Sequence, residues 1–415
     1  MPEESYKWAA LESKIRQIFI RYNFEELRTP IFEQTELFAR GIGQATDIVA
    51  KEMYTFLDRG KKQLTLKPEM TAPIMRAYLE HKLYARSPLH KFFYLAPLFR
   101  QENPQAGRLR QFHQFGAETI GSARAEADAE IIDLAMTIFE EIGLKNLKLF
   151  INSIGDHRDR QKYRRILQEY VKPQLPGYCP DCQRRYHENP LRILDCKIEG
   201  CMRLNRDAPA ISEHLFDESR DHYQRLKEQL DRLGIPFAEN PYLVRGLDYY
   251  TRTVFEISSD ALGAQNAICG GGRYDLLAVE LGGTPTPAVG FASGIERVLM
   301  VAEKQNIALA EPFHPQVFLV CVGDRAQTEG LFWLKTIRRA GWHAEQDFLG
   351  RSVKAQMREA NRQLAEVVII LGDEEMENKR FSVKRMQEGS QEQVPFENLL
   401  EYLNQVLIRR NPTII

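Results

Sequence analysis

The sequence predicts an α+β fold, in which an antiparallel sheet with helices is interrupted by a mostly helical insertion and followed by an α/β domain. Two β-rich runs, residues 92–99 and 111–120, flank a polar loop over residues 101–109, a pattern typical of a β-hairpin. Residues 156–240 are charged and mostly helical in pattern. Beyond residue 312, apolar strands alternate with helices, which indicates parallel βαβ units.

These changes in character divide the chain into four segments. We expect residues 1–155 and 241–311 to form the two parts of one main domain. Residues 156–240 would be the insertion between them, and residues 312–415 would form the C-terminal domain. A chain of 415 residues is long enough for two or three domains.

Hydrophobic periodicity predicts the local elements. A first helix over residues 6–22 carries an apolar stripe that includes Leu11 and Ile15. Gly143 is well placed to end a second helix over residues 126–142. The other predicted elements are helices over residues 73–84, 328–340 and 352–364, and strands over residues 317–322, 343–346 and 367–371.

Composition excludes a few classes of protein. Lys and Arg, 56 residues, nearly balance Asp and Glu, 57 residues, so the net charge neither indicates nor excludes a nucleic-acid partner. The first residues lack the basic and then apolar layout of a signal peptide. The longest apolar runs, such as residues 367–371, are too short to cross a bilayer. We therefore expect a soluble cytoplasmic protein without a membrane partner.

The strand predicted over residues 111–120 carries an unusual set of side chains on one face. Because side chains alternate along a strand, one face holds a cation, a ring, an amide, a gap and a carboxylate. These residues are Arg110, Phe112, Gln114, Gly116 and Glu118. Arg100 and Glu102, at the loop end of the incoming strand, would share this surface. A nucleotide with a small polar molecule would suit it, although a solvated sheet face gives the same pattern.

Two further segments combine glycine, arginine and tyrosine. Residues 245–252 read RGLDYYTR, which could form a hydrogen-bonding pocket or a strand edge with aromatic packing. Residues 270–275 read GGGRYD. Three glycines let a backbone approach another group closely, but by itself this segment favours a tight turn. Its spacing is not that of a dinucleotide fingerprint.

Two helix starts complete the candidate features. Residues 288–297 read as a short strand that enters a helix whose first turn bears Arg297, an arrangement that favours phosphate. A surface ion pair of Arg297 would explain it equally simply. Glu69 and Thr71 stand two residues apart just before a predicted helix, where they could also act as helix caps.

In this order, and over nearly the whole chain, these segments resemble the histidyl-tRNA synthetase family. The most specific matches are FRQE at residues 99–102 with RQFHQFG at 110–116, RGLDYY at 245–250 and GGGRYD at 270–275. The segment of Arg297 resembles a general class II motif, and Thr29-Pro30 resembles the end of another, which builds the dimer interface in the family.

The resemblance implies a class II synthetase with a six- or seven-stranded antiparallel sheet, a C-terminal anticodon-binding α/β domain and a homodimer. The main domain would be catalytic. ATP, with Mg²⁺ on its phosphates, would activate L-histidine to histidyl-adenylate, and the histidyl group would pass to the 3′ end of tRNA(His). Because histidine supplies the nucleophile, no serine or cysteine triad is expected.

Matching positions imply a role for each candidate residue. Arg100 would hold the α-phosphate, and Arg245 would stabilise the charge that develops there, so both would be catalytic. Gln105 and Arg108 would meet the tRNA acceptor end. The ATP-binding residues implied are Arg100, Glu102, Arg108, Phe112 and Arg297. The histidine-binding residues implied are Glu69, Thr71, Gln114, Glu118, Tyr249, Tyr250 and Tyr274.

Four of the six cysteines are clustered in the insertion, at Cys179, Cys182, Cys196 and Cys201. The first pair has the spacing of a zinc knuckle, and the second is looser but acceptable. They would bind a structural Zn²⁺, with His187 as a substitute ligand, or remain four free thiols.

Two other functions compete with a histidine–tRNA ligase. A synthetase-like regulatory subunit of ATP phosphoribosyltransferase would keep the fold and bind histidine without catalysis, but such paralogues typically lack the C-terminal domain and parts of the histidine signatures. A synthetase for threonine, proline or glycine would share a similar C-terminal domain. Glu118 and the Tyr249-Tyr250 pair argue against the second alternative.

Overall fold

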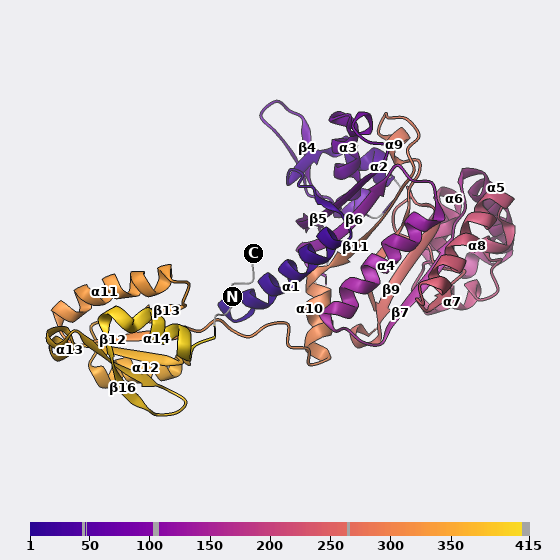
Figure 1. The fold of residues 1–415 in the computed structure, drawn as a ribbon. Helices are drawn as coiled ribbons and strands as arrows, with labels where there is room; N and C mark the ends of the chain where they lie inside the picture. The colour runs from indigo at the N-terminus through magenta and orange to yellow at the C-terminus, as the bar shows by residue number, and fades with distance from the viewer. Residues whose placement is uncertain (44–45, 47, 103–107, 264–265, 409–415) are drawn as a thin grey trace. The chain divides into compact units, whose positions relative to one another are not determined.

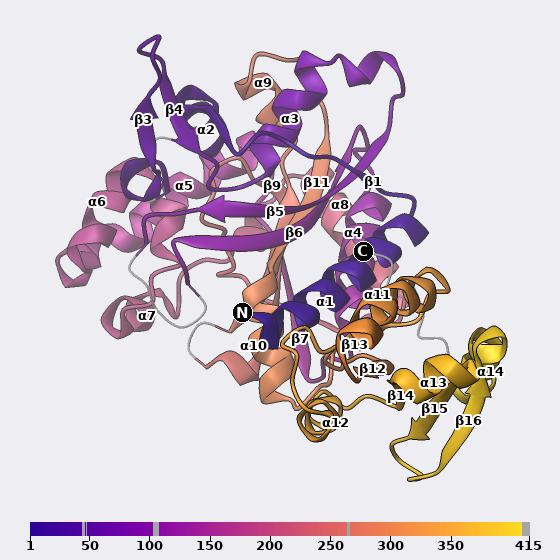
Figure 2. The same cartoon turned by 90° about the vertical axis from the view of Figure 1, so that its left-hand side faces the viewer.

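A computed structural model of the chain describes residues 1–43, 46, 48–102, 108–263 and 266–408. Two compact units are distinguished by their internal contacts, residues 14–309 and residues 1–13 with 310–415 (Figures 1 and 2). Each unit has its own sheet and its own buried core, and each is described by itself.

The larger unit is built on an eight-stranded sheet in the order β1-β5-β6-β11-β10-β9-β7-β8 (Figure 2). The six central strands, which are β5, β6, β11, β10, β9 and β7 in sheet order, pair antiparallel. The edge strands β1 and β8 pair parallel with their neighbours. The resemblance implied six or seven antiparallel strands, and the two short edge strands extend this core. The strands are β1 Glu25–Glu26, β5 His90–Phe99, β6 Gln111–Ile120, β7 Leu147–Ser153, β8 Phe237–Glu239, β9 Thr251–Ser259, β10 Ala267–Arg273 and β11 Ala288–Gly294.

The predicted hairpin is confirmed by β5 and β6. The two strands pair antiparallel with Leu98 opposite Phe112 and Tyr94 opposite Gly116. On the other face of β6, Phe115 and Ala117 point into the core and have no exposed surface. One strand therefore separates a polar face from a packed face, as its alternating sequence requires.

Helices cover the packed face of the sheet. Helix α4 (Ala125–Ile142) lies beside α8 (Asp217–Arg232) and contacts β11, β10 and β6 (Figure 1). Helix α10 (Ile295–Lys304) contacts β6 and β11. The rings of Phe115 and Phe139 pack at 6.3 Å. Gly143 ends α4 in the left-handed conformation, with φ of 94°, as predicted.

The remaining elements of the larger unit lie around this sheet. Residues 14–21 of helix α1 (Pro2–Arg21) belong to this unit, and the helix confirms the first predicted helix and begins earlier than expected. Its Phe19 ring stacks on Phe93 of β5 at 4.6 Å. The other helices here are α2 Thr35–Ile42, α3 Thr71–Glu80, α5 His157–Val171, α6 Pro180–Glu188, α7 Glu199–Asn205 and α9 Leu277–Glu280. A small sheet has the order β2-β4-β3, formed by Phe32–Gln34, Gln63–Leu66 and Thr55–Leu57. The span 156–240 is mostly helical, as predicted.

The smaller unit has a five-stranded sheet in the order β13-β12-β14-β15-β16. Its first three strands pair parallel, which confirms the βαβ pattern, whereas β15 and β16 add an antiparallel hairpin that periodicity did not predict. The strands are β12 Val317–Cys321, β13 Ala344–Gln346, β14 Val367–Leu371, β15 Arg380–Arg385 and β16 Gln391–Pro395. The helices are α11 Asp324–Arg339, α12 Val353–Arg362, α13 Asp373–Asn378 and α14 Leu399–Val406.

Within the described residues, no helix combines the length and apolar character needed to span a bilayer.

A buried ion pair connects α4 to the sheet and to the insertion. Asp128 and Arg273 have no exposed surface and form an ion pair. His222 of α8 and Thr253 of β9 also hydrogen bond to Asp128, with heavy-atom distances of 2.7 and 2.6 Å. Burial alone would raise the pKa of Asp128, yet Arg273 and His222 hold this pKa below its usual value.

Replacing Asp128 should therefore destabilise the protein strongly. In Asp128→Ala the Arg273 charge stays buried without its main partner, so the free energy of unfolding should fall by about 3–5 kcal/mol in urea titrations. The control is Glu126→Ala on the same helix, whose exposed pair with Arg124 is worth less than about 1 kcal/mol. Equal losses in the two variants would contradict this assignment.

Candidate active site

Two adjoining cavities open on the polar face of the large sheet. The inner cavity has a volume of about 190 Å³ and the outer cavity about 630 Å³. They share a boundary formed by Arg100, Gln114, Arg245, Gly246, Gly270 and Ala292. A ligand in the inner cavity can therefore meet a ligand in the outer cavity at a place with two guanidinium groups and one amide.

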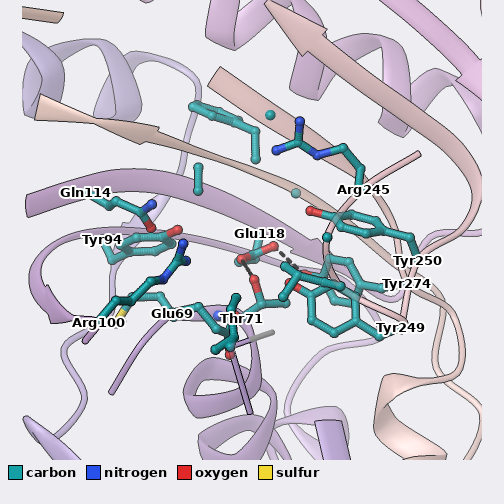
Figure 3. A pocket seen from close by; sticks show the side chains of 18 residues that line it. Glu69, Thr71, Tyr94, Arg100, Gln114, Glu118, Arg245, Tyr249, Tyr250 and Tyr274 are labelled. Carbon is teal, nitrogen blue, oxygen red and sulfur yellow. Dashed lines mark hydrogen bonds between the residues drawn. The ribbon is translucent and has the colours of Figure 1, made fainter. Parts of the chain in front are cut away.

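Glu118 lies at the base of the inner cavity, where β6 approaches β11 (Figure 3). Only 1% of its surface is exposed. Thr71 donates its hydroxyl to one carboxylate oxygen at 2.8 Å, and Tyr274 donates to the other through a short bond. A Cβ at Gly290 would lie 1.7 Å from this carboxylate, so the neighbouring strand needs glycine there.

Glu69 and Thr71 stand at the start of α3. The Glu69 carboxylate accepts hydrogen bonds from the backbone amides of Thr71 and Ala72, at 2.7 and 2.9 Å. Helix capping, the simpler explanation of this residue, is thus present. Glu69 also lines the inner cavity. Burial raises its pKa, against the effect of the two amides.

Three of the tyrosines that line the inner cavity were predicted from the sequence. Tyr249 packs on Tyr250 and Tyr274, with ring centroids 4.8 and 5.6 Å apart (Figure 3). Burial raises the pKa of Tyr250 to about 12, with Arg245 acting in the opposite direction. These phenols therefore stay protonated at neutral pH and can donate or accept hydrogen bonds.

Arg245 lies at the boundary of the two cavities. Its Nη1 donates to Glu256 at 2.7 Å, and its guanidinium lies against the backbone of Gly270, where a Cβ would be 1.9 Å from Nη2. The interpretation of residues 270–272 as a tight turn is wrong, because they lie within β10. Glycine is needed at residue 270 because the arginine takes the space of a side chain.

The outer cavity collects the other cations. Arg100 lies over the Phe112 ring at 5.2 Å and donates to the Pro68 carbonyl at 2.9 Å. Arg108 pairs with Glu102 at 3.1 Å. Arg297, at the start of α10, donates to the Ala267 carbonyl at 2.6 Å and lines the outer cavity. Burial and the nearby Arg108 lower the Arg297 pKa.

Not every candidate residue reaches these cavities. The residues that the resemblance implied for ATP binding and for histidine binding all line one cavity or both. Arg110, on the same face of the sequence pattern, is exposed and lines neither. Gln105 lies outside the described residues.

The four clustered cysteines come together in the insertion. Their sulfur atoms all lie within 4.8 Å of one another. Cys179 precedes α6, which contains Cys182, Cys201 lies in α7, and Cys196 lies between these helices. His187 is not part of this group.

Sequence reasoning missed several residues of the two cavities. Tyr94 lines the inner cavity, but it stands in an apolar run on β5 that gives no signal. Glu256 was detectable, since it is the one carboxylate within β9, a strand otherwise rich in apolar and hydroxyl residues. Asp195, Lys197 and Met202 of the insertion line the outer cavity, a contact that only the tertiary structure reveals.

The antiparallel sheet, its cation-rich pair of cavities and the separate α/β unit agree with the class II synthetase architecture that the sequence resemblance implied. The family described as histidyl-tRNA synthetase matches residues 1–298, and an anticodon-binding domain matches residues 316–406. The chain belongs to the histidyl-tRNA synthetase family.

Individual relatives agree over nearly the full length. The histidine–tRNA ligase of Desulforamulus reducens is 49% identical over 97% of this chain and 96% of its own. That of Caldanaerobacter subterraneus subsp. tengcongensis is 47% identical over 95% and 94%. The crystal structure of apo S. aureus histidyl-tRNA synthetase has a TM-score of 0.83 and 40% identity, covering 97% of this chain and 96% of that one.

The buried carboxyl of Glu118 should give protein stability a distinctive pH dependence. Burial raises its pKa to about 8, despite the hydrogen bonds from Tyr274 and Thr71, whereas an unfolded glutamate titrates near about 4.3. The stability that the protonated carboxyl contributes is therefore present below about pH 4.3 and is lost as the pH rises through about 8.

Glu118→Gln removes this titration. As the pH rises from 5 to 9, the unsubstituted protein should lose about 3–5 kcal/mol more of its unfolding free energy than the variant does. Urea titrations at each pH measure the difference. Glu303→Gln, on an exposed position of α10, is the control and should change nothing. Parallel pH profiles for Glu118→Gln and the unsubstituted protein would contradict the buried, protonated state.

Proposed function

We propose that the protein is a histidine–tRNA ligase, which activates histidine with ATP and transfers the histidyl group to the 3′ end of tRNA(His). One observation carries the proposal: a small polar cavity and a cation-rich cavity meet at Arg100, Gln114 and Arg245. An amino acid and a nucleotide bound side by side would bring a carboxylate and an α-phosphate to this boundary. The full-length relatives named histidine–tRNA ligase support the same function.

The inner cavity is suited to histidine. An imidazole can donate a hydrogen bond at one nitrogen and accept one at the other. Glu118 would face one nitrogen, and the Tyr250 hydroxyl would face the other, with Tyr249 and Tyr274 completing the wall. An amino acid without both groups would leave buried polar atoms unpaired, which is strongly penalised. The amino and carboxylate ends of histidine would contact Glu69, Thr71 and Gln114.

The outer cavity is suited to ATP. Phe112 would stack on adenine, and Arg297 would cover the other face of the base and the γ-phosphate. Glu102 and Arg108 would contribute further polar contacts. Mg²⁺ accompanies ATP in this family, and the carboxylates of Glu102 and Glu256 line the cavity, as oxygen ligands for this ion should. Bound there, Mg²⁺ would neutralise phosphate charge.

The reaction needs positioned cations and no protein nucleophile. A carboxylate oxygen of histidine forms a bond to the α-phosphorus, and the bond from that phosphorus to pyrophosphate breaks. Arg100 would hold the α-phosphate, and Arg245 would stabilise the negative charge that builds up during this displacement. A ribose hydroxyl at the tRNA 3′ end then attacks the histidyl carbonyl, and AMP leaves.

The tRNA would contact the protein at two places. Residues 312–415 would bind the anticodon, consistent with the anticodon-binding domain matched at residues 316–406. Arg108 and Gln105 would meet the acceptor end. Residues 1–155 and 241–311 would then be the catalytic domain, interrupted by the insertion 156–240.

The regulatory-subunit alternative has less support. Such a protein would bind histidine without turning ATP over. The two histidine–tRNA ligases compared above are 47% and 49% identical to this chain, which covers at least 94% of each of them.

Three finer features belong to this proposal. The protein would be a homodimer, since Phe32 and Phe56 of the small sheet are 49% and 44% exposed and pack on each other at 6.4 Å. It would be cytoplasmic, where tRNA and ATP are available. The cysteine cluster would bind a structural Zn²⁺ that takes no part in the reaction.

Histidine-dependent exchange of pyrophosphate into ATP should test the activity directly. Arg245→Ala should lower this rate by about 10²–10³-fold or more, because it removes a preorganised cation from the α-phosphate. Arg232→Ala, an exposed arginine of α8, is the matched control and should retain the full rate. Exchange with another amino acid would overturn the substrate, and a full rate in Arg245→Ala would remove its role.

The dimer is tested by sedimentation velocity. Phe32→Ser with Phe56→Ser should shift the protein toward the monomer, because both changes remove apolar surface from the proposed contact. The exposed Phe348 of the other unit, changed to serine, is the control. A monomeric unsubstituted protein would refute the homodimer.

A further inference from the structure

The cysteine cluster has the geometry of a tetrahedral thiolate site. Zinc–sulfur bonds of about 2.3 Å place tetrahedral sulfur atoms about 3.8 Å apart. Cys179 Sγ and Cys196 Sγ lie 3.9 Å apart, and all four sulfurs lie within 4.8 Å of one another. A disulfide needs about 2.05 Å, and all four cysteines are free thiols. The donor set therefore fits a zinc ion.

The cluster joins three separate pieces of the insertion. Cys179 and Cys182 stand at the start of α6, and Cys201 lies in α7. The Cys201 sulfur accepts a hydrogen bond from the backbone amide of Cys179 at 3.3 Å. Cys196 lies between them in a stretch without helix. Cys182, Cys196 and Cys201 are buried. A metal ion would be the strongest link between these short elements.

The residues that flank two of the cysteines reach the outer cavity. Asp195 and Lys197, on either side of Cys196, line that cavity and pair with each other at 3.1 Å. Met202, next to Cys201, lines it as well. None of these three residues lines the inner cavity. The cluster thus lies directly behind one wall of the proposed nucleotide site.

The same stretch is bonded to the segment of Arg245. We call residues 189–202 the wall segment. Asn189, at its start, donates to the Asp248 carboxylate at 2.8 Å, and Arg192 donates to the Gly246 carbonyl at 2.9 Å. Asp195 also acts electrostatically on Arg245. The wall segment is held by the cluster on one side and holds residues 246–248 on the other.

We propose that a zinc ion on Cys179, Cys182, Cys196 and Cys201 fixes the wall segment, so that nucleotide binding depends on the metal although the metal never contacts the nucleotide. The proposal deepens the proposed function and rests on it for the identity of ATP. Loss of zinc would release Asp195, Lys197 and Met202 from the cavity wall. Among the described residues, the base of the histidine pocket, where Glu118 of β6 meets Thr71 at the start of α3, makes no contact with the wall segment and would keep its shape.

The test compares the full-length protein before and after zinc removal. Zinc content, measured by elemental mass spectrometry, should be about one ion per chain as purified. Chelation followed by return of excess Mg²⁺ should raise the Kd for ATP about tenfold, a change of about 1.4 kcal/mol, while the Kd for histidine, whose pocket shares only the 246–250 loop with the wall segment, rises by a clearly smaller factor. Re-added zinc should restore ATP binding. Calorimetric titration with ATP alone and with histidine alone gives both constants.

Substitutions make the result independent of the chelator. Cys182→Ala should lose zinc and ATP affinity together, and Cys321→Ala, in the other unit, is the control that keeps both. Arg192→Met should keep its zinc and still weaken ATP binding, because it cuts the wall segment from Gly246. This variant keeps the test valid even where Cys182→Ala does not fold.

Three results would overturn the inference. One is a purified protein that neither contains nor takes up zinc. Another is a zinc-free protein that binds ATP as tightly as before. The last is an equal loss of histidine and ATP binding, which reports general unfolding. Failure of the proposed function is distinguishable, because it would appear as absent histidine-dependent exchange in protein that still carries zinc.

Discussion

A carboxyl group that is almost completely removed from water needs hydrogen-bond partners, and Glu118 obtains them from distant parts of the chain. Thr71 comes from the start of α3, and Tyr274 follows the end of β10. Gly290 of β11 gives the carboxylate room. This one group therefore fixes how a helix and three strands of the sheet meet. The inner cavity exists because these elements converge there.

The order of charges around the two cavities follows from that arrangement. Polar groups that would hydrogen bond to a small ligand line the inner cavity, and the arginines line the boundary and the outer cavity. Arg245 is held by Glu256 and by the bare backbone at Gly270, so its position is set before any ligand arrives. Preorganised cations of this kind need no rearrangement when charge develops on a phosphate.

Much of this could be predicted from sequence where the signal was local. The alternation along β6 indicated Phe112, Gln114 and Glu118 as one face, and the strand-to-helix pattern indicated Arg297. Sequence patterns failed to predict the features that depend on how distant side chains pack together. Three adjacent glycines favour a turn until Arg245 is known to lie against the first of them, Gly270, within β10. Tyr94, the hairpin of β15 and β16, and the contact of the wall segment with the outer cavity depend on tertiary neighbours that no local pattern encodes.

The central claim is that the two cavities form one continuous site. A non-hydrolysable analogue of histidyl-adenylate, which joins histidine to adenosine, measures this continuity by calorimetric titration against histidine and AMP alone. A ligand that spans both cavities should bind at least about 10³-fold tighter than either part, because the contacts of both are made with one loss of freedom. An analogue that binds no more tightly than the better of its two parts would contradict the account.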